Sequence, residues 1–190
     1  MGKKFKATSM EKLDNPLRRK LLPPYEIIKG LDMQEGSRIA DVGCGIGYFT
    51  IPFGKTVGDK GIVYAVDINP SMLEETRRRT EKENLTNVEI IQSSENDFKL
   101  EDSAVDVVFT STVFHEVDRP ERFLDECKRV LRKKGTLIIL DWNRVEEELG
   151  PPIHERMDIE LVKKHVIEAN LAIKEIDYIN NSFYILKCTL

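Results

Sequence analysis

Hydrophobic residues in this chain gather in short apolar runs, separated by stretches in which apolar and charged residues alternate with helical spacing. Unbroken apolar runs are typical of parallel strands covered on both faces, and helical spacing predicts amphipathic helices between them. The strands are expected at 39–42, 62–67, 88–92, 104–109 and 136–142. The helices are expected at 25–31, 70–84, 120–131 and 158–169. This alternation predicts an α/β sheet with helices on both faces.

The end of the chain departs from the alternation. Two apolar runs, at 173–179 and 183–189, follow one another and are joined at Asn180-Asn181, which predicts a closing hairpin. A turn at Lys134-Gly135 is expected to lead into the strand at 136–142. One chain of 190 residues without internal repeats fits a single domain with its own core.

The segment ahead of the first strand has a short amphipathic pattern at 10–22, broken by Pro16 and stopped by Pro23-Pro24. Basic residues concentrate in it. They are Lys3, Lys4, Lys6, Lys12, Arg18, Arg19 and Lys20. We expect mainly the solvated face of a mobile arm, with contact to an anionic substrate as the lesser alternative.

Three closely spaced glycines follow the first strand, in Gly43-Cys44-Gly45-Ile46-Gly47. Glycine is needed where a loop takes positive φ angles or brings bare backbone against a ligand. The amides at the start of the next helix then face a bound polar group. Asp41, at the end of the strand, adds a carboxylate for ligand donors. The combination predicts a nucleotide-like ligand.

A second acid, Asp67, ends the next strand. It lies about 20 residues beyond the last glycine, the interval at which a Rossmann-type unit places an acid on ribose hydroxyls. One carboxylate can accept hydrogen bonds from both vicinal hydroxyls. The sequence leaves open the alternative that Asp67 only caps the following helix, which is entered through Asn69-Pro70-Ser71. We expect ribose binding.

The spacing of the glycines differs from the dinucleotide fingerprint Gly-x-Gly-x-x-Gly, because the third glycine comes one residue early. With Asp41 ahead of it, the loop resembles motif I of the class I S-adenosylmethionine-dependent methyltransferases. Residues 106–137 are similar to the type 11 branch of that family, which includes quinone-biosynthesis methyltransferases. The similar stretch ends in Arg129-Val130-Leu131, then Lys134-Gly135-Thr136-Leu137.

The resemblance implies a Rossmann-like doubly wound α/β fold, with a seven-stranded, mostly parallel sheet and an antiparallel C-terminal strand. It implies S-adenosyl-L-methionine as cofactor. It also implies a division into an N-terminal helical lid or arm, residues 1–30, and an S-adenosylmethionine-binding methyltransferase domain, residues 31–190. Leu22, Pro23 and Tyr25 are expected to line the site as part of that lid, with plain packing on the sheet edge as the alternative.

Carried over residue by residue, the resemblance implies a set of cofactor-binding residues. These are Asp41, Gly43, Gly45, Gly47, Tyr48, Asp67, Ile68, Met72, Ser94, Glu95 and Ser111. Met72 is expected beside the adenine, with core packing as an equal alternative. The family's Gly-Asp-Ala segment falls on Ser93-Ser94-Glu95, so the acceptor for the adenine amine is Ser94 or Glu95. We favour Glu95 as the stronger acceptor.

Methyl transfer from a sulfonium needs an aligned acceptor in a desolvated chamber, without a covalent nucleophile or metal. An oxygen or activated carbon acceptor also needs a base. His115 is the candidate, because its ordinary pKa lies near neutrality and it follows the fourth strand; a hydrogen bond to substrate or backbone is the alternative. Glu116 is expected to cap or pair. His154 is expected to face either substrate or solvent, and His165 to be structural.

Composition excludes several classes. The net charge of −4 gives no overall attraction to nucleic acid or anionic lipid, and no apolar run is long enough to span a bilayer. We therefore expect a cytoplasmic protein with no nucleic-acid or membrane partner; a homodimer stays open. Cys44, Cys127 and Cys188 are odd in number and widely spaced, which predicts reduced structural thiols and no metal site.

The expected reaction is methyl transfer to an O, C or N atom of a small molecule. The motif Asp/Asn-Pro-Pro-aromatic of enzymes that methylate nucleic-acid bases is replaced here by Thr110-Ser111-Thr112-Val113. An NAD-dependent oxidoreductase on the same sheet is disfavoured by the glycine spacing. A regulatory module that binds S-adenosylmethionine without catalysis, and methylation of a protein side chain, stay open.

Overall fold

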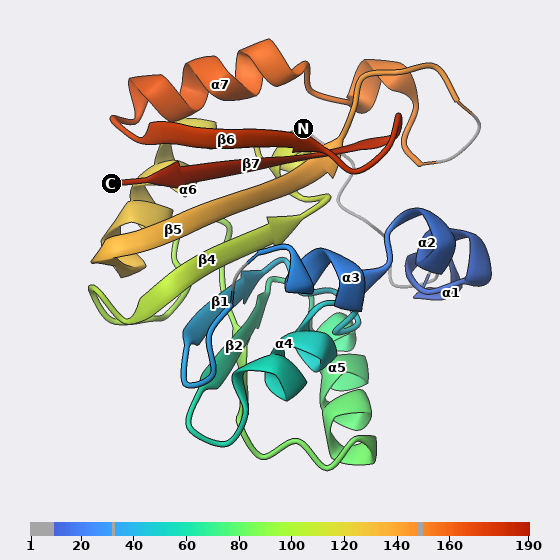
Figure 1. Cartoon of the computed structure of the whole chain (residues 1–190), viewed down its shortest axis with the longest axis vertical. Coiled ribbons are helices and arrows are strands. Elements are labelled where there is room, and N and C mark those ends of the chain that lie inside the picture. Colours follow the sequence, from blue (N-terminus) through green and yellow to red (C-terminus); the bar gives the residue numbers. More distant parts are fainter. Residues whose placement is uncertain (1–9, 32, 148–149) are drawn as a thin grey trace.

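The computed structural model describes residues 10–31, 33–147 and 150–190. They form one seven-stranded sheet in the order β3-β2-β1-β4-β5-β7-β6 (Figure 1). Five strands run parallel: β1 Arg38–Val42, β2 Ile62–Asp67, β3 Val88–Gln92, β4 Val105–Ser111 and β5 Leu131–Trp142. The hairpin strands are β6 Ala172–Tyr178 and β7 Phe183–Thr189, and β7 is antiparallel to both of its neighbours. The predicted fold class is confirmed.

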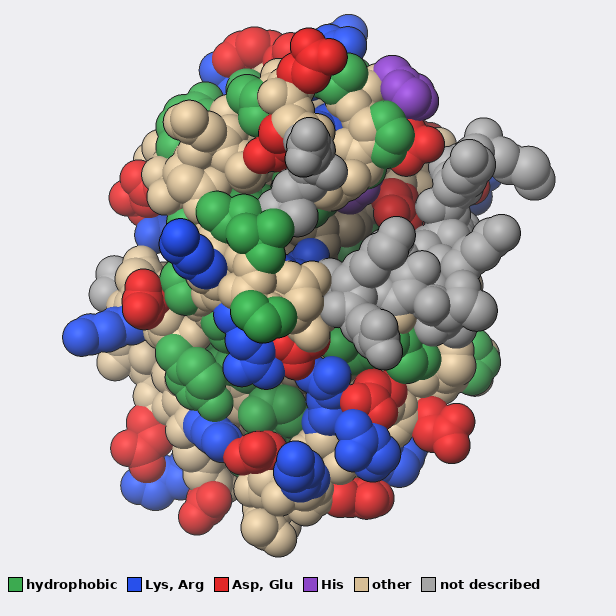
Figure 2. All heavy atoms as spheres, turned by 90° about the vertical axis from the view of Figure 1, so that its right-hand side faces the viewer, with side chains coloured by type: hydrophobic (Ala, Val, Ile, Leu, Met, Phe, Trp, Pro, Cys, Tyr) green, Lys and Arg blue, Asp and Glu red, His purple; other side chains and the backbone are tan. Residues whose placement is uncertain are grey.

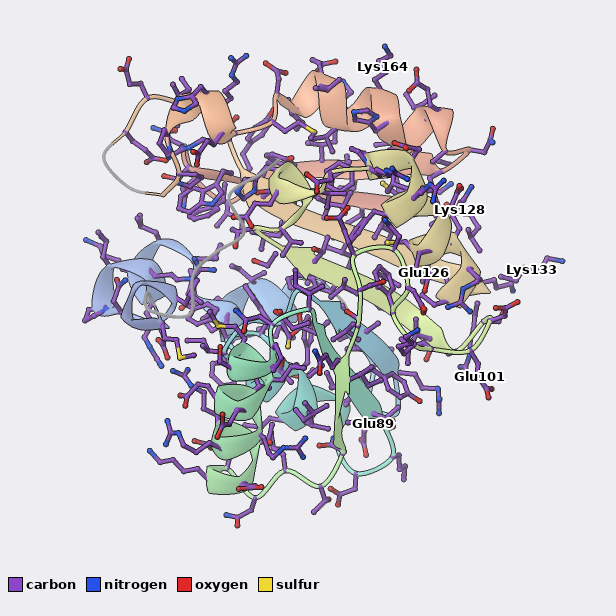
Figure 3. All side chains as sticks on the ribbon, turned by 180° about the vertical axis from the view of Figure 1, so that it is seen from behind. Glu89, Glu101, Glu126, Lys128, Lys133 and Lys164 are labelled. Carbon is purple, nitrogen blue, oxygen red and sulfur yellow. The ribbon has the colours of Figure 1, made fainter. Side chains whose placement is uncertain are left out.

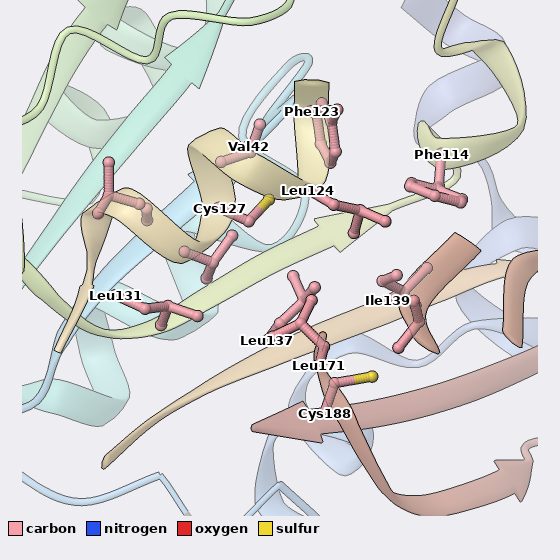
Figure 4. Close-up of a cluster of buried hydrophobic side chains, with 14 of the residues drawn as sticks. Val42, Phe114, Phe123, Leu124, Cys127, Leu131, Leu137, Ile139, Leu171 and Cys188 are labelled. Atoms are coloured by element: carbon pink, nitrogen blue, oxygen red, sulfur yellow. The ribbon is translucent and has the colours of Figure 1, made fainter. Parts of the chain in front are cut away.

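Helices cover both faces of the sheet. On one face lie α3 Pro24–Lys29, α4 Thr50–Val57 and α5 Pro70–Lys82, and on the other α6 Pro120–Val130 and α7 Ile159–Glu168. Each face buries its own apolar cluster. In the cluster beneath α6 and α7, Leu124 and Cys127 of α6 pack over Leu137 of β5 and Cys188 of β7 (Figure 4). Cores on both faces explain why the strands read as unbroken apolar runs.

Local sequence signals start the helices where expected. The Asn69 side chain accepts a hydrogen bond from the Ser71 amide and caps α5, which has Pro70 at its first position. The Asp158 side chain accepts from the Glu160 amide and caps α7. The predicted helix at 158–169 is thus confirmed, with Asp158 and Ala169 as its caps.

One connection differs from the prediction. We expected a helix to 131, a turn at Lys134-Gly135 and a strand from 136, but β5 begins at Leu131, directly after α6. Leu131 pairs with Val105 and Thr136 with Val107, so the residues between form an irregularity in the ladder. Gly135 is required there because a Cβ would lie 2.7 Å from Leu131 Cδ2 and 2.9 Å from the carbonyl oxygen of Asp106. Lys134-Gly135, which predicted a turn, lies at a bulge within the strand.

The N-terminal helices lie beside the carboxyl ends of the strands (Figure 1). They are α1 Met10–Leu13 and α2 Pro16–Leu21. Asp14 joins them to the domain, because its carboxylate binds Arg19 at 2.6 Å and Arg79 of α5 at 2.7 Å. Lys3, Lys4, Lys6 and the side chain of Lys12, part of the expected mobile arm, lie outside the described residues.

The back of the molecule carries charged side chains (Figure 3). Glu89 projects from β3, an edge strand, and a charged side chain on an edge opposes pairing with another sheet. Glu126 of α6 is an exception because it is 7% exposed, and it accepts hydrogen bonds from the Phe98 amide and from Arg129. Among the described helices, none has the length and apolar character needed to cross a membrane.

Candidate active site

A cavity of about 610 Å³ lies at the carboxyl ends of β1, β2, β4 and β5. It is placed where the order of the strands reverses between β1 and β4, the position at which open α/β sheets bind ligands. Figure 2 looks onto this side of the molecule, where acidic and hydrophobic side chains surround a hollow. The acidic residues that line the cavity are Asp41, Asp67, Glu95, Glu116 and Glu155.

The glycine loop forms one wall of this cavity. Gly43 has a φ of +73°, and a Cβ there would lie 2.3 Å from a methyl carbon of Val113. The amides of Gly43 and Cys44 both donate to the carbonyl of Val66, which holds the loop against β2. Gly47, with a φ of +77°, faces Thr76 of α5 and does not line the cavity. Its role is to shape the loop.

Asp67 connects the loop to the start of α5. Its carboxylate accepts hydrogen bonds from the Gly45 amide at 2.9 Å and the Asn69 amide at 2.8 Å. Burial raises the pKa of this carboxyl, while the amide hydrogen bonds oppose the shift. Asp67 lines the cavity, and each oxygen keeps a further lone pair for a ligand donor. The helix cap itself is Asn69.

Asp41 is 2% exposed at the end of β1. The Thr50 hydroxyl donates to its carboxylate at 2.6 Å. Burial, reinforced by the nearby charge of Asp67, raises the pKa of Asp41 to about 7, and the hydrogen bond from Thr50 opposes the shift. Asp41 lines the cavity, so a ligand meets a carboxyl that titrates near neutral pH.

Most other residues expected at the cofactor also line the cavity. They are Gly43, Gly45, Tyr48, Ile68, Met72, Ser94, Glu95 and Ser111. The expectation that Leu22, Pro23 and Tyr25 line the site is wrong, and Leu22 follows the alternative of plain packing. Leu22 is fully buried in the core beneath α3, Pro23 lines a separate small hollow, and Tyr25 is 52% exposed. The N-terminal segment contributes Leu13, Asn15 and Arg18 in their place.

Arg18 of α2 reaches into the cavity, and the sequence did not single it out as a ligand. Its guanidinium carbon lies 5.1 Å from the centre of the Tyr48 ring, and its Nη2 is 3.5 Å from the Thr112 hydroxyl. Within the described part of the chain, buried Arg18 Nε and Ser111 Oγ have no hydrogen-bond partner. Burial lowers the pKa of Arg18 from its ordinary value. Unsatisfied polar atoms on a cavity wall indicate a polar ligand.

His115 follows β4 and lies against the end of β5. Its side chain is 5% exposed, and its Nδ1 is 2.7 Å from the carboxylate of Asp141, which also accepts the His115 backbone amide. Because a carboxylate only accepts, Nδ1 carries the proton and Nε2 is the basic nitrogen. Nε2 lies 3.7 Å from Glu116. Burial lowers the pKa of His115, but the charges of Asp141, Glu116 and Glu155 outweigh it, so the pKa is raised.

The other two histidines lie outside the cavity, and the three cysteines are buried thiols. His154 is exposed and His165 is partly buried on α7; neither lines the cavity. All three cysteines are free and buried, as predicted, and Cys44 lines the cavity within the glycine loop. Among the described residues there is no group of His, Cys, Asp and Glu side chains suited to a metal ion.

Comparison with known proteins identifies the family. The family model described as "Methyltransferase domain" matches residues 40–139, which span β1 to β5 and include the glycine loop, Asp67 and His115. The chain belongs to this methyltransferase family. The methyltransferase is similar over nearly its whole length to an S-adenosylmethionine-dependent methyltransferase from Aquifex aeolicus, with 33% identity, a TM-score of 0.93, and coverage of 97% of this chain and 98% of that one.

Curated relatives extend the comparison. The methyltransferase is 30% identical to the ubiquinone/menaquinone biosynthesis C-methyltransferase UbiE of Vibrio parahaemolyticus over 68% of this chain and 50% of the relative. It is 35% identical to an uncharacterized 37.1 kDa transposon protein of Streptomyces fradiae over 62% of this chain and 34% of that protein. The chain thus spans half or less of these relatives. The cofactor expected from the sequence agrees with the Aquifex aeolicus relative, which is described as S-adenosylmethionine-dependent.

Two residues of the methyltransferase site carried little signal in the sequence. Asp141 is an acid at the end of an apolar strand, and its pairing with His115 joins residues 26 positions apart. The signal available in the sequence was that Asp141 is an isolated charge in a strand that is otherwise apolar and buried, where a charge needs a partner. Arg18 belongs to a run of basic residues that we interpreted mainly as a solvated face, with contact to an anionic substrate as the lesser alternative.

Proposed function

We propose that this enzyme transfers the methyl group of S-adenosylmethionine to a small molecule whose accepting O, C or N atom loses a proton, with His115 as the base. The observation that carries the proposal is that one cavity contains both the glycine loop and a buried histidine held by Asp141. Its acidic lining and the net charge of −4 favour a small acceptor over a nucleic acid.

The residues that line the cavity fit the cofactor. S-adenosylmethionine supplies an activated methyl group on a sulfonium sulfur. We assign its ribose to Asp67, its adenine to Ile68, Met72 and the Ser94-Glu95 pair, and its amino-acid portion to the glycine loop, Tyr48 and Ser111. Glu95 is partly buried and Ser94 is exposed, so Glu95 stays our choice as the acceptor for the adenine amine. Gly43 and Gly45 line the cavity with positive φ angles, so bare backbone faces the ligand at both positions.

Arg18 is proposed to hold the carboxylate of the cofactor. Its buried Nε lacks a partner, and a guanidinium binds a carboxylate through two parallel hydrogen bonds. Arg18→Ala is expected to weaken S-adenosylhomocysteine binding by about 10- to 100-fold, because a charge-assisted hydrogen bond contributes about 1.5–3 kcal/mol. Titration calorimetry measures the change. The neighbouring surface residue Lys20 gives the control, Lys20→Ala, which should bind like wild type; equal affinity of the Arg18 variant would remove the assignment.

Asp41 is expected to couple cofactor binding to pH. In the free enzyme its pKa is raised to about 7, so at pH 6 it is mostly neutral. The sulfonium and ammonium of the cofactor favour the ionised form, so binding releases a proton below pH 7 and affinity rises with pH up to about 7. Calorimetry in buffers of different ionisation enthalpy measures the release. Asp41→Asn should abolish it; wild-type binding without proton release at pH 6 would contradict the expectation.

His115 and its surroundings define the proton transfer. Asp141 fixes the ring, so Nε2 is the nitrogen that takes the proton of the acceptor. Burial of the ring limits water at that atom. Glu116, whose side chain is 29% exposed and 3.7 Å from Nε2, stabilises the resulting imidazolium and connects it to solvent. We thus extend the role of Glu116 beyond the pairing expected from sequence.

A screen for the acceptor tests the proposal. Purified enzyme is incubated with methyl-labelled S-adenosylmethionine and a panel of 2-naphthol, 1,4-dihydroxynaphthalene and phenethylamine, followed by small-molecule extracts and a lysate. Labelled small molecules support the proposal. Labelled protein would redirect it to side-chain methylation. Cofactor binding without any labelled product would favour a regulatory module.

A further inference from the structure

One wall of the cavity is built by the end of β5 and the chain that follows it. Trp142, Gly150, Pro151 and Glu155 line it, together with Phe183 of β7. Except for Phe183, these residues lie within 142–156, and all five lie outside the segment that the family model matches. Because β5 and β7 lie on the other side of β4 from β1, which leads into the glycine loop, this is the end of the cavity where an acceptor would lie. The inference therefore rests on the proposed function.

A fully buried arginine holds that wall together. The Arg156 side chain is 0% exposed. Its Nε donates to the carbonyl of Pro151 at 2.9 Å, and its Nη1 lies 3.1 Å from the carbonyl of Asn143 and 3.2 Å from that of Val145. The planar guanidinium fork thus contacts both described parts of the segment, 143–147 and 150–156. Lysine has no such fork.

Further hydrogen bonds link Arg156 to the β6–β7 turn. Its Nη1 donates to Glu147 at 2.6 Å, and the other Glu147 oxygen accepts from the Ser182 hydroxyl at 2.7 Å. Asn180 in the same turn accepts from the Ser182 amide. The buried charge is therefore compensated within the wall, and loss of one partner would leave the other buried without its counter-charge.

Trp142 is the surface that this arrangement positions. The Arg156 guanidinium lies 4.8 Å from the centre of the indole, and the ring of Phe183 lies 4.2 Å away. A Cβ on Gly150 would meet the indole at 2.6 Å, and Gly150 has a φ of +83°. Contacts from Arg156, Phe183 and Gly150 fix the indole, which is 6% exposed.

We propose that Arg156 is a positioning residue for the methyl acceptor: it fixes Trp142 and Pro151 as a preformed wall, and thereby sets which acceptors fit. Arg156 does not itself line the cavity, so it acts through the groups that do. Acceptor selection is then separable from cofactor binding, because the residues assigned to the cofactor lie on other elements.

Trp142 is the single tryptophan of the chain, so its fluorescence reports this wall directly. The test compares Arg156→Lys and Gly150→Ala with Arg144→Lys, a matched control in the same segment whose side chain is 51% exposed. Both test variants should increase acrylamide quenching of Trp142 severalfold and leave S-adenosylhomocysteine affinity unchanged. With the panel compound that wild type methylates fastest, acceptor KM should rise about tenfold or more, with a smaller change in kcat.

Quenching and acceptor KM equal to wild type in Arg156→Lys would overturn the proposal. So would a parallel loss of S-adenosylhomocysteine affinity, since it would indicate general destabilisation. If wild type binds S-adenosylhomocysteine but methylates no panel compound, the acrylamide quenching of Trp142 in Arg156→Lys and Gly150→Ala alone decides whether the proposal holds. Failure of wild type to bind S-adenosylhomocysteine would instead count against the proposed function.

Discussion

His115→Asn is expected to leave S-adenosylmethionine affinity near wild type and to lower turnover by about 10²- to 10⁴-fold, the usual contribution of a general base. The asparagine amide can donate to Asp141 as Nδ1–H does, so the local hydrogen bond is kept while the basic Nε2 is removed. Turnover is measured with the best acceptor from the screen, and affinity by calorimetry. Wild-type turnover in the variant would remove His115 as base.

The pH profile gives a second readout for His115. Its pKa is raised, and the base must be neutral, so wild-type turnover should increase with pH through a value above that of an ordinary histidine and then level off. His115→Asn should lose this step. The raised pKa means that the folded state favours protonated His115. The contribution of His115 to the free energy of unfolding is therefore full at acidic pH and is lost as pH rises through the folded-state pKa.

Asp67→Ala is expected to weaken cofactor binding by about 100-fold or more, roughly 3 kcal/mol, because two ribose hydroxyls lose a charged acceptor. The variant also leaves the Gly45 and Asn69 amides without their acceptor, which should lower the free energy of unfolding by about 1–3 kcal/mol. Calorimetric titration and denaturant unfolding measure the two effects separately.

Asp67→Asn is the companion variant. It keeps one acceptor oxygen for a backbone amide and removes the charge, so stability should recover while affinity stays reduced. If both variants bound the cofactor as wild type does, Asp67 would be a loop-bracing residue alone, close to the capping role that the sequence left open.

Where the chain is predictable, a local pattern and the tertiary environment agree. The strands at 88–92 and 183–189 have the predicted bounds, because apolar runs there end at turn residues such as Asn180-Asn181. The glycine loop was recognisable because its backbone requirement is local to 43–47. The start of β5 was not, since only the pairing of Leu131 with Val105 makes that residue part of the sheet.

The site is less predictable than the fold, because its missing residues are defined by partners distant in sequence. Asp141 acquires its role only beside His115, and Arg18 only over Tyr48. Both lie outside 40–139, the segment that carries the family's pattern. The resemblance therefore pointed to residues within that segment and left Arg18 and Asp141 undescribed.

The way in which helix α2 is held in place bears on the release of the spent cofactor. No residue of α2 is fully buried, and its apolar contact with the core comes from the partly buried Leu21. Its other contacts are polar: Arg18 over Tyr48, the Asn180 side chain on the Leu21 carbonyl, and, just ahead of the helix, the Asp14 bridge to Arg79. An element that buries so little apolar surface opens at a lower free-energy cost than the strands of the core. Because Arg18 of α2 lines the cavity, we expect the spent cofactor to leave through local opening of this one helix, while the sheet stays intact.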